Sequence, residues 1–312
     1  QAAVNASQYL YVPPGRYKFG STVSLANAQV VFGAGKSGWE PYHASVVGHP
    51  FPDTVKSEIL VDGIKAFDAS GRNSAAIRGL SIKAIAGTQS VYGLPAGYQA
   101  GAIGIDITAS SQFEADDVSF FGLETAILAT QGATAQMPKI TNWSASDCDR
   151  VFRFGSALTS EYIVRDSYIG NCTVALHNNG IVEAHHCDGL RIESCRFFPG
   201  YGSAIYVRKT PFLSIIGVTV FETGSDAVVL EESNYVTMAG FNIVRPGRYK
   251  TAQPWPQRKA LVLTNCTDVA FQGLISEPSG MPVRIAGCSN ITINAAFQVP
   301  FSGTGNEQNS DG

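Results

Sequence analysis

A short strand-like motif recurs at nearly regular intervals along the second half of the chain. It begins at positions 164 (VRDSYIG), 192 (IESCRFF), 215 (IIGVTVF), 238 (MAGFNIV) and 271 (FQGLISE), so successive starts differ by 28, 23, 23 and 33 positions. Each copy is followed by a second short β-rich stretch and a polar corner. A unit of this size is typical of one coil of a parallel β-solenoid, which buries its inward side chains only by stacking on its neighbours.

Alternation within these stretches predicts an inward-facing set of apolar side chains. Its clearest members are Val218, Val220, Val228, Leu230, Phe241 and Ile243. Charged residues make up only 15% of the chain and glycine 32 of its 312 residues, which favours turn-rich β structure over helix. We therefore expect an all-β chain, with one parallel β-helix domain over residues 1–300 and a polar tail or linker of a longer chain at 301–312.

The six cysteines test the repeat. Cys148 and Cys172 differ by 24 positions and Cys266 and Cys288 by 22, so each pair is predicted to stack in adjacent coils as free, half-buried thiols. Disulfides in these positions would need converging Cβ atoms. The Cys/His cluster EAHHCD at 183–188 lacks a second ligand pair, so we expect no metal and no cofactor.

The net charge of −3 provides no polybasic surface for nucleic acid, and no run of about 18 apolar residues predicts membrane insertion. Small molecules, glycans and proteins stay open as partners. Three Asn-x-Ser/Thr sequons, at Asn171, Asn265 and Asn290, fall at predicted corners, where asparagine tolerates a left-handed backbone.

The segment YLYVPPGRYKFGSTVSLANAQVVFGAG at 9–35 resembles the N-terminal coil of the pectate-lyase-like family of right-handed β-helix proteins. In that family a V-Y-x-P-x-G-x-Y strand and turn lead to an apolar strand that closes in G-x-G. The family includes bacteriophage tailspikes that degrade bacterial surface polysaccharides, and secreted pectinases and lyases. Together with the repeat, the resemblance covers roughly residues 9–298 and implies a right-handed, single-stranded parallel β-helix, commonly a homotrimer on a virion tail.

A looser resemblance lies at ETGSDAVVLEESNYVTMAG, residues 222–240. It is similar to the G-D-D-C-I-x-I segment of polygalacturonase-type inverting hydrolases, with Ser225 in place of the first aspartate. The Gly-His-Gly segment of those enzymes is not evident here. Of their aspartates only Asp226 carries over.

Glycoside hydrolysis requires two carboxyl groups on either side of one bond. Glu222 and Asp226 flank the short corner ETGSD, and Glu277 stands at the equivalent corner two units later. The aligned units place Arg245 one coil above Glu222 and Lys259 next to Asp226. We therefore predict Glu222 and Asp226 as the catalytic pair, with Glu277 in reserve.

The longest interval contains an insertion at 245–259 that can form one side of a sugar-binding groove or, alternatively, a subunit contact. Its aromatic side chains can stack on sugar rings and its cations can bind acidic groups. The predicted substrate-binding residues are Arg245, Tyr249, Trp255, Lys259, Tyr201 and Arg208.

A second cluster is an alternative site. Glu183, His185 and His186 lie in the unit that starts at 164, and their corner is predicted to stack towards Arg208, Glu231 and Glu232. Histidine and arginine beside an acidic sugar suit β-elimination, in which a base removes the C5 proton and a cation neutralises the carboxylate. A non-catalytic histidine pair at a corner is the other interpretation.

The sequence thus predicts a tailspike-like depolymerase that hydrolyses a bacterial surface polysaccharide and acts at the bacterial surface from a virion tail. Secretion is the alternative location. A polysaccharide lyase and a non-catalytic glycan-binding solenoid are the alternative functions.

Overall fold

A computed structural model describes residues 7–36, 56–87, 97–130, 134–156, 158, 161–247, 258–278 and 281–298. The backbone of 173–176 is included, without the side chains. All regular elements in these ranges are β-strands, and the strand pairs are parallel. The described residues contain no helix long and apolar enough to cross a membrane.

The first strands belong to the coils of the N-terminal half of the stack and are between 2 and 11 residues long. They are β1 (Tyr9–Val12), β2 (Gly15–Lys18), β3 (Val23–Ser24), β4 (Val30–Gly33), β5 (Ser57–Val61), β6 (Lys65–Asp68), β7 (Ala76–Ala84), β8 (Gln99–Asp106), β9 (Glu114–Phe121), β10 (Leu123–Ala129), β11 (Ala135–Gln136), β12 (Lys139–Thr141) and β13 (Ser144–Phe154).

The later strands continue the same stack towards the C-terminal end. They are β14 (Val164–Arg165), β15 (Tyr168–His185), β16 (Cys187–Asp188), β17 (Arg191–Phe197), β18 (Ser203–Arg208), β19 (Ser214–Ile216), β20 (Thr219–Phe221), β21 (Val228–Glu231), β22 (Asn234–Val244), β23 (Leu261–Thr264), β24 (Thr267–Ser276), β25 (Val283–Ala286) and β26 (Ser289–Gln298).

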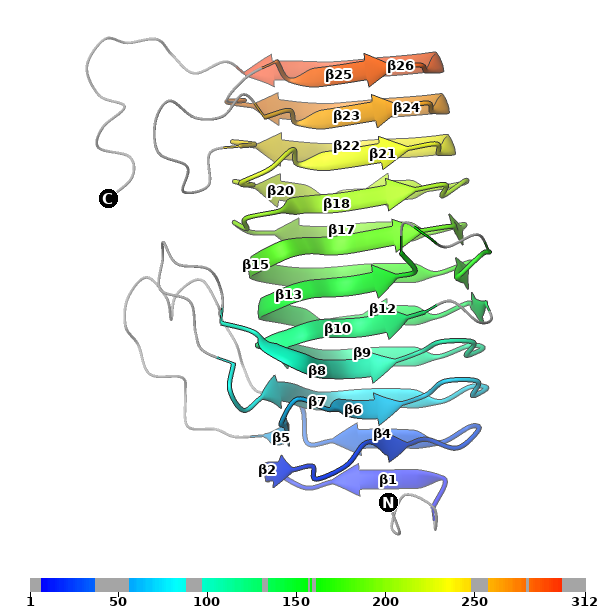
Figure 1. Cartoon of the computed structure of the whole chain (residues 1–312), viewed down its shortest axis with the longest axis vertical. Coiled ribbons are helices and arrows are strands. Elements are labelled where there is room, and N and C mark those ends of the chain that lie inside the picture. Colours follow the sequence, from blue (N-terminus) through cyan, green and yellow to red (C-terminus); the bar gives the residue numbers. More distant parts are fainter. Residues whose placement is uncertain are drawn as a thin grey trace, which may run out of the picture.

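Each strand pairs with the strand one coil away, so the coils form a column that rises from β1 to β26 (Figure 1). The column has three faces. The first contains β1, β4, β12 and β19, the second β2, β5 and β20, and the third β6, β8, β10, β18, β21, β23 and β25, while longer strands such as β15 bend from one face into the next. This is the parallel β-helix that the repeat predicts.

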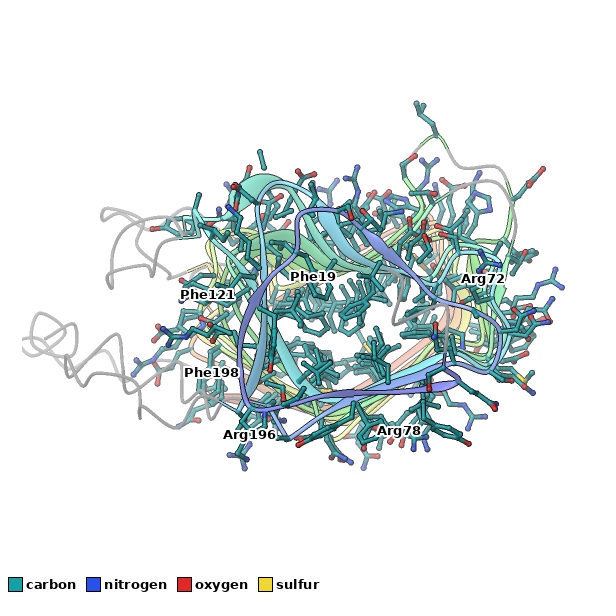
Figure 2. The ribbon with its side chains drawn as sticks, turned by 90° about the horizontal axis from the view of Figure 1, so that it is seen from below. Phe19, Arg72, Arg78, Phe121, Arg196 and Phe198 are labelled. Atoms are coloured by element: carbon teal, nitrogen blue, oxygen red, sulfur yellow. The ribbon has the colours of Figure 1, made fainter. Side chains whose placement is uncertain are left out.

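The core is built from ladders of apolar side chains, one from each coil. On the third face the register runs Phe67, Ile105, Ile127, Phe152, Val182, Ile205, Val228, Leu261 and Val283. Figure 2, which looks along the column, shows Phe19 inside the coil and Arg72, Arg78 and Arg196 outside it. The predicted inward set is buried. Burial of each large apolar side chain stabilises the fold by about 1.5–3 kcal/mol.

Left-handed residues form the corners. Asn171, Asn265 and Asn290 have φ angles of 53°, 53° and 52°, which confirms the interpretation of these asparagines as corner residues. The amide of Asn290 donates to Asp268 in the preceding coil. Because neighbouring coils repeat the same bend, each corner supports the one above it.

One part of the predicted alignment is wrong. The register places Ile169, and not Val164, opposite Ile192, so the predicted start of this unit at Val164 is wrong. The extra residues belong to the preceding coil, which runs from Ile140 to its partner Ile169 and is longer than the coil that follows it, from Ile169 to Ile192.

The same error affects one cysteine pair. Cys148 lies opposite His177, while Cys172 lies opposite Cys195, so the predicted Cys148–Cys172 ladder is wrong. The Cys266–Cys288 ladder is confirmed, since the Cys266 backbone N–H donates to Cys288 Sγ at 3.3 Å. All six thiols are free, as predicted.

Candidate functional site

Two groups of charged side chains lie along the third face and the corner that leads into it from the second face. We call Glu222, Asp226, Arg245, Lys259 and Glu277 the upper cluster. The lower cluster consists of Asp149, Arg150, Glu183, His185 and Tyr206.

Arg245 joins the two glutamates of the upper cluster. Its Nη1 lies 3.2 Å from Glu222 Oε1 in the coil below, and its Nε lies 3.1 Å from Glu277 Oε2 in the coil above. The φ angles of Glu222, Arg245 and Glu277 are 41°, 51° and 49°, so all three are left-handed corner residues. The predicted position of Arg245 above Glu222 is confirmed. Both glutamates are ion-paired to the same guanidinium.

Asp226 begins the third face in the coil of Glu222. Its Oδ1 accepts a hydrogen bond from the backbone N–H of Lys259 at 2.7 Å, so the predicted adjacency of these residues is confirmed through the backbone. Tyr201 is half-buried at the corresponding corner one coil below, where its N–H donates to the carbonyl of His177 at 3.0 Å. Tyr249 and Trp255 lie outside the described residues.

Arg150 joins the two carboxylates of the lower cluster. Its Nη1 lies 3.1 Å from Asp149 Oδ2, and its Nε pairs with Glu183 in the next coil. Asn179 donates to the other oxygen of Asp149 at 2.7 Å. The Asp149 side chain exposes 4% of its surface and that of Glu183 20%, so the cluster opens to solvent on the Glu183 side.

These environments shift the two carboxyl pKa values in opposite directions. Burial raises the pKa of Asp149 above its ordinary value and outweighs the hydrogen bond from Asn179 and the charge of Arg150. Burial would also raise the pKa of Glu183, but the hydrogen bond from His185 and the charge of Arg150 outweigh it and lower that pKa. One carboxyl is therefore favoured as a proton donor and the other as an anion.

His185 and Tyr206 are neighbours of Glu183, the first through a hydrogen bond and the second as its partner in the next coil. His185 Nε2 donates to Glu183 Oε1 at 3.3 Å, and its ring centroid lies 5.4 Å from that of Tyr206. Tyr206 donates to Glu231 at 2.9 Å, and burial together with that carboxylate raises the pKa of Tyr206 to about 12. Tyr206 is thus held as a neutral hydrogen-bond donor.

Arg208, His186 and Glu232 of the predicted alternative site lie at the next corner of the coil. Arg208 donates to Glu232 at 2.7 Å, at the corner between the third and first faces. His186 is a left-handed residue of that corner, and burial with the charges of Lys209 and Arg208 lowers its pKa. The predicted stacking of this corner is confirmed, and Arg208 and Glu232 form an ion pair there.

The two clusters lie along one ladder. Arg150 pairs with Gly180 and Gly180 with Ser203, and extending the β18–β21 register back from Ile205 places Ser203 opposite Asp226. Arg150 and Asp226 are thus three strand spacings apart, or about 14 Å. Small residues occupy the ladder positions between them.

Sequence reasoning missed Asp149, Arg150 and Tyr206. The stretch SDCDRV at 146–151 carries two aspartates and an arginine in a strand otherwise lined by buried residues, and this was the available signal. No group of three or more His, Cys, Asp or Glu side chains that could hold a metal ion occurs in the described ranges.

The stacked parallel coils, with the two charged clusters along one face, define the class of protein: a right-handed parallel β-helix. No protein-family model matches the sequence, and neither does any curated protein. Solved structures do match its fold.

The enzymatically active domain of tailspike protein 2 from bacteriophage CBA120 matches 88% of this chain at 12% identity, with a TM-score of 0.65. The chain spans only 39% of the length of that domain. DFA-IIIase from Arthrobacter chlorophenolicus A6, in complex with DFA-III, matches 96% of this chain and 76% of its own at 16% identity and a TM-score of 0.63.

The A-module of the mannuronan C-5 epimerase AlgE6 from Azotobacter vinelandii matches 97% of this chain and 91% of its own, at 11% identity and a TM-score of 0.50. At these identities the likeness concerns the fold.

Proposed function

We propose that the protein is a tailspike-like depolymerase that hydrolyses a glycosidic bond of a bacterial surface polysaccharide. The fold is shared with an enzymatically active tailspike domain, with DFA-IIIase and with a mannuronan C-5 epimerase. Fold similarity alone does not assign chemistry, so the proposal depends on the charged clusters of the third face.

The observation that carries the proposal is the opposite shift of the Asp149 and Glu183 pKa values around one guanidinium. Glycoside hydrolysis uses one carboxylic acid to protonate the leaving oxygen and one carboxylate as base or nucleophile. Asp149 is the general acid in this assignment and Glu183 the carboxylate. His185 is a positioning residue that keeps Glu183 ionised.

The upper cluster is the second candidate for the catalytic pair, as the sequence predicts for Glu222 and Asp226. In the proposal the upper cluster binds substrate, because Glu222 and Glu277 are both ion-paired to Arg245. Asp226 lies about 14 Å from Arg150 along the third face, which is the distance between the two clusters. A polysaccharide lying along the ladder would contact both clusters. Arg245 and Lys259 would then bind acidic or hydroxyl groups of the chain.

A lyase is the second candidate function. The 5.4 Å contact between His185 and Tyr206, beside Arg150, supports it, since β-elimination uses a base and a cation near the sugar carboxylate. Hydrolysis is preferred because Tyr206 donates a hydrogen bond to Glu231 and stays neutral, so it does not serve as the base of a β-elimination.

Assembly and location complete the proposal. The resemblance to tailspikes implies a homotrimer carried on a virion tail, and tailspike protein 2 is among the structures that share the fold. Light scattering of the purified protein tests the trimer: a monomeric mass would contradict it.

The function is tested by incubating the protein with a panel of bacterial capsules and O-antigens while following reducing ends and ultraviolet absorbance of the unsaturated product. Reducing ends without absorbance indicate hydrolysis; both together indicate a lyase. No cleavage of any polysaccharide, with binding retained, would leave a glycan-binding solenoid and refute the enzyme.

The residue assignment is tested with Asp149→Asn and Glu183→Gln, each expected to lower kcat at least about 100-fold. Glu114→Gln is the matched control, because Glu114 is also ion-paired to an arginine, Arg78, but on the first face. Loss of activity in Glu222→Gln and Asp226→Asn, with Asp149→Asn and Glu183→Gln active, would move the site to the upper cluster.

A further inference from the structure

Two exposed aromatic rings stack on each other at the corner between the third and first faces. The centroids of Phe212 and Tyr235 lie 5.1 Å apart and their planes differ by 9°. The two residues expose 58% and 56% of their surface. Neither ring contributes to the core of the β-helix.

Both residues occupy backbone positions that disfavour them. Phe212 has a φ of 56° and Tyr235 a φ of 57°, and a bulky residue with a left-handed backbone is a genuine outlier. In the two coils on either side the same ladder position holds residues that tolerate this conformation. They are Asp166, Gly189, Asp268 and Asn290. One coil beyond Asp166 the position holds Met137, with a φ of 51°. Such outliers cluster at functional sites, where strain is retained for a purpose.

A cavity of about 310 Å³ adjoins the stack at the coil of Gly189. Gly189 N–H donates to the carbonyl of Pro211 and Phe212 N–H to that of Asn234, so Phe212 lies between Gly189 and Tyr235 along the ladder. Tyr235 covers one face of the Phe212 ring. The other face is therefore directed towards the position where Gly189 has no side chain, with Asp166 one coil further on.

Several polar side chains that line the cavity lack partners in the described part of the chain. Ser167 is 1% exposed, and its Oγ has no hydrogen-bond partner there. Asp166, Asp188 and Arg191, also in the lining, form no ion pair with any other described residue. Carboxylates without a protein partner can accept hydrogen bonds from a ligand that enters the cavity.

We propose that this cavity binds one neutral sugar ring. The apolar face of the sugar stacks on Phe212, and its hydroxyls donate to Asp166 and Asp188. Two strand spacings, about 9.6 Å, separate the coils of Asp166 and Phe212, which is enough for one flat ring between them. The lining carries two carboxylates, Asp166 and Asp188, and one guanidinium, Arg191. This net negative charge favours a neutral sugar over an acidic one.

This site goes beyond the proposed function. It lies at the corner between the third and first faces, whereas both clusters begin at the corner between the second and third. A glycan could therefore be held here while the lower cluster acts on another chain segment. The inference stands whether or not the protein cleaves polysaccharide.

The test uses saturation-transfer NMR with methyl glycosides of glucose, galactose, mannose, rhamnose and N-acetylglucosamine at millimolar concentration. Phe212→Asn removes the stacking face while keeping a residue that accepts a left-handed backbone. Gly189→Asn fills the cavity and also keeps that backbone. We expect at least one glycoside to bind the wild-type protein and to lose most of its transfer signal in both variants.

Thermal unfolding distinguishes a binding role from a structural one. If Phe212 is retained for binding, Phe212→Asn unfolds at the same temperature as the wild type or higher, because strain is relieved. The control Phe32→Ser alters another exposed aromatic pair, Tyr11 and Phe32, and is expected to leave binding intact. Absence of wild-type binding to every glycoside, or equal signals in wild type and both variants, overturns the proposal.

Discussion

Nη1 of Arg245 lies 3.2 Å from Oε1 of Glu222, one coil away, and both residues have a left-handed backbone. The pair is partly exposed, at 36% and 22% of the side-chain surface, so solvent screens it. The position of the pair on the proposed substrate path therefore concerns binding more than folding.

Replacing Arg245 by Met is expected to raise KM several-fold with kcat largely preserved, and to change the free energy of unfolding by about 1 kcal/mol or less. Michaelis kinetics on the cleaved polysaccharide and urea unfolding measure both. If kcat instead fell a hundredfold, the chemistry would belong to the upper cluster.

The hydrogen bond from His185 to Glu183 predicts the acid side of the pH–rate profile. This bond helps lower the pKa of Glu183, so His185→Leu is expected to raise that pKa and move the acid limb of kcat/KM to higher pH. His185→Gln, which can still donate, is expected to move the limb less. Identical acid limbs in the wild type and both variants would exclude Glu183 as the ionised group.

His177 makes stability depend on pH. It is 1% exposed, and burial lowers its pKa from 6.5 to about 3. Between pH 3 and pH 6.5 the unfolded chain binds more protons at this residue than the folded chain does. The contribution of His177 to the free energy of unfolding is therefore fully present above pH 6.5 and is lost as the pH falls towards 3.

The expected slope from His177 is up to about 1.4 kcal/mol per pH unit. Urea unfolding at several pH values between these limits measures it, and His177→Phe is expected to show a shallower dependence. Parallel pH curves for the two proteins would mean that His177 is not the responsible group.

Gly273 is required by the close approach of two coils. A Cβ atom there would lie 1.8 Å from the carbonyl oxygen of Phe241, which as a backbone atom has little freedom to move. Gly273→Ala is expected to cost about 3 kcal/mol in the free energy of unfolding. Gly20→Ala is the control, since nothing lies within 4 Å of a Cβ at that position; similar losses in both would refute the steric explanation.

The repeat was predictable because stacking requires apolar residues at equivalent positions of each coil. Met238, Phe271 and Ile293 are opposite one another in the register, and the pattern in the sequence already shows the first two at the same place in their units. The upper cluster followed from this regular spacing. Its members lie in coils whose length the pattern gives correctly.

The lower cluster could not be found in this way. Arg153 lies opposite Glu183, in a coil that the connection after β13 makes longer than the coil that follows it, from Glu183 to Tyr206. The spacing of the later coils therefore places Glu183 beside the wrong residue. The VRDSYIG stretch also extends over a corner, from β14 into β15, and its apolar residues do not indicate which of them begins the new coil.

The coil architecture also limits how the distance between the two clusters can change. Each coil between Arg150 and Asp226 adds one strand spacing, about 4.8 Å, and nothing smaller. Deleting the segment 192–214 would join equivalent points of two coils, because Ile192 is opposite Ile215. The distance over which the two clusters can contact one polymer is therefore adjustable only in steps of a whole coil.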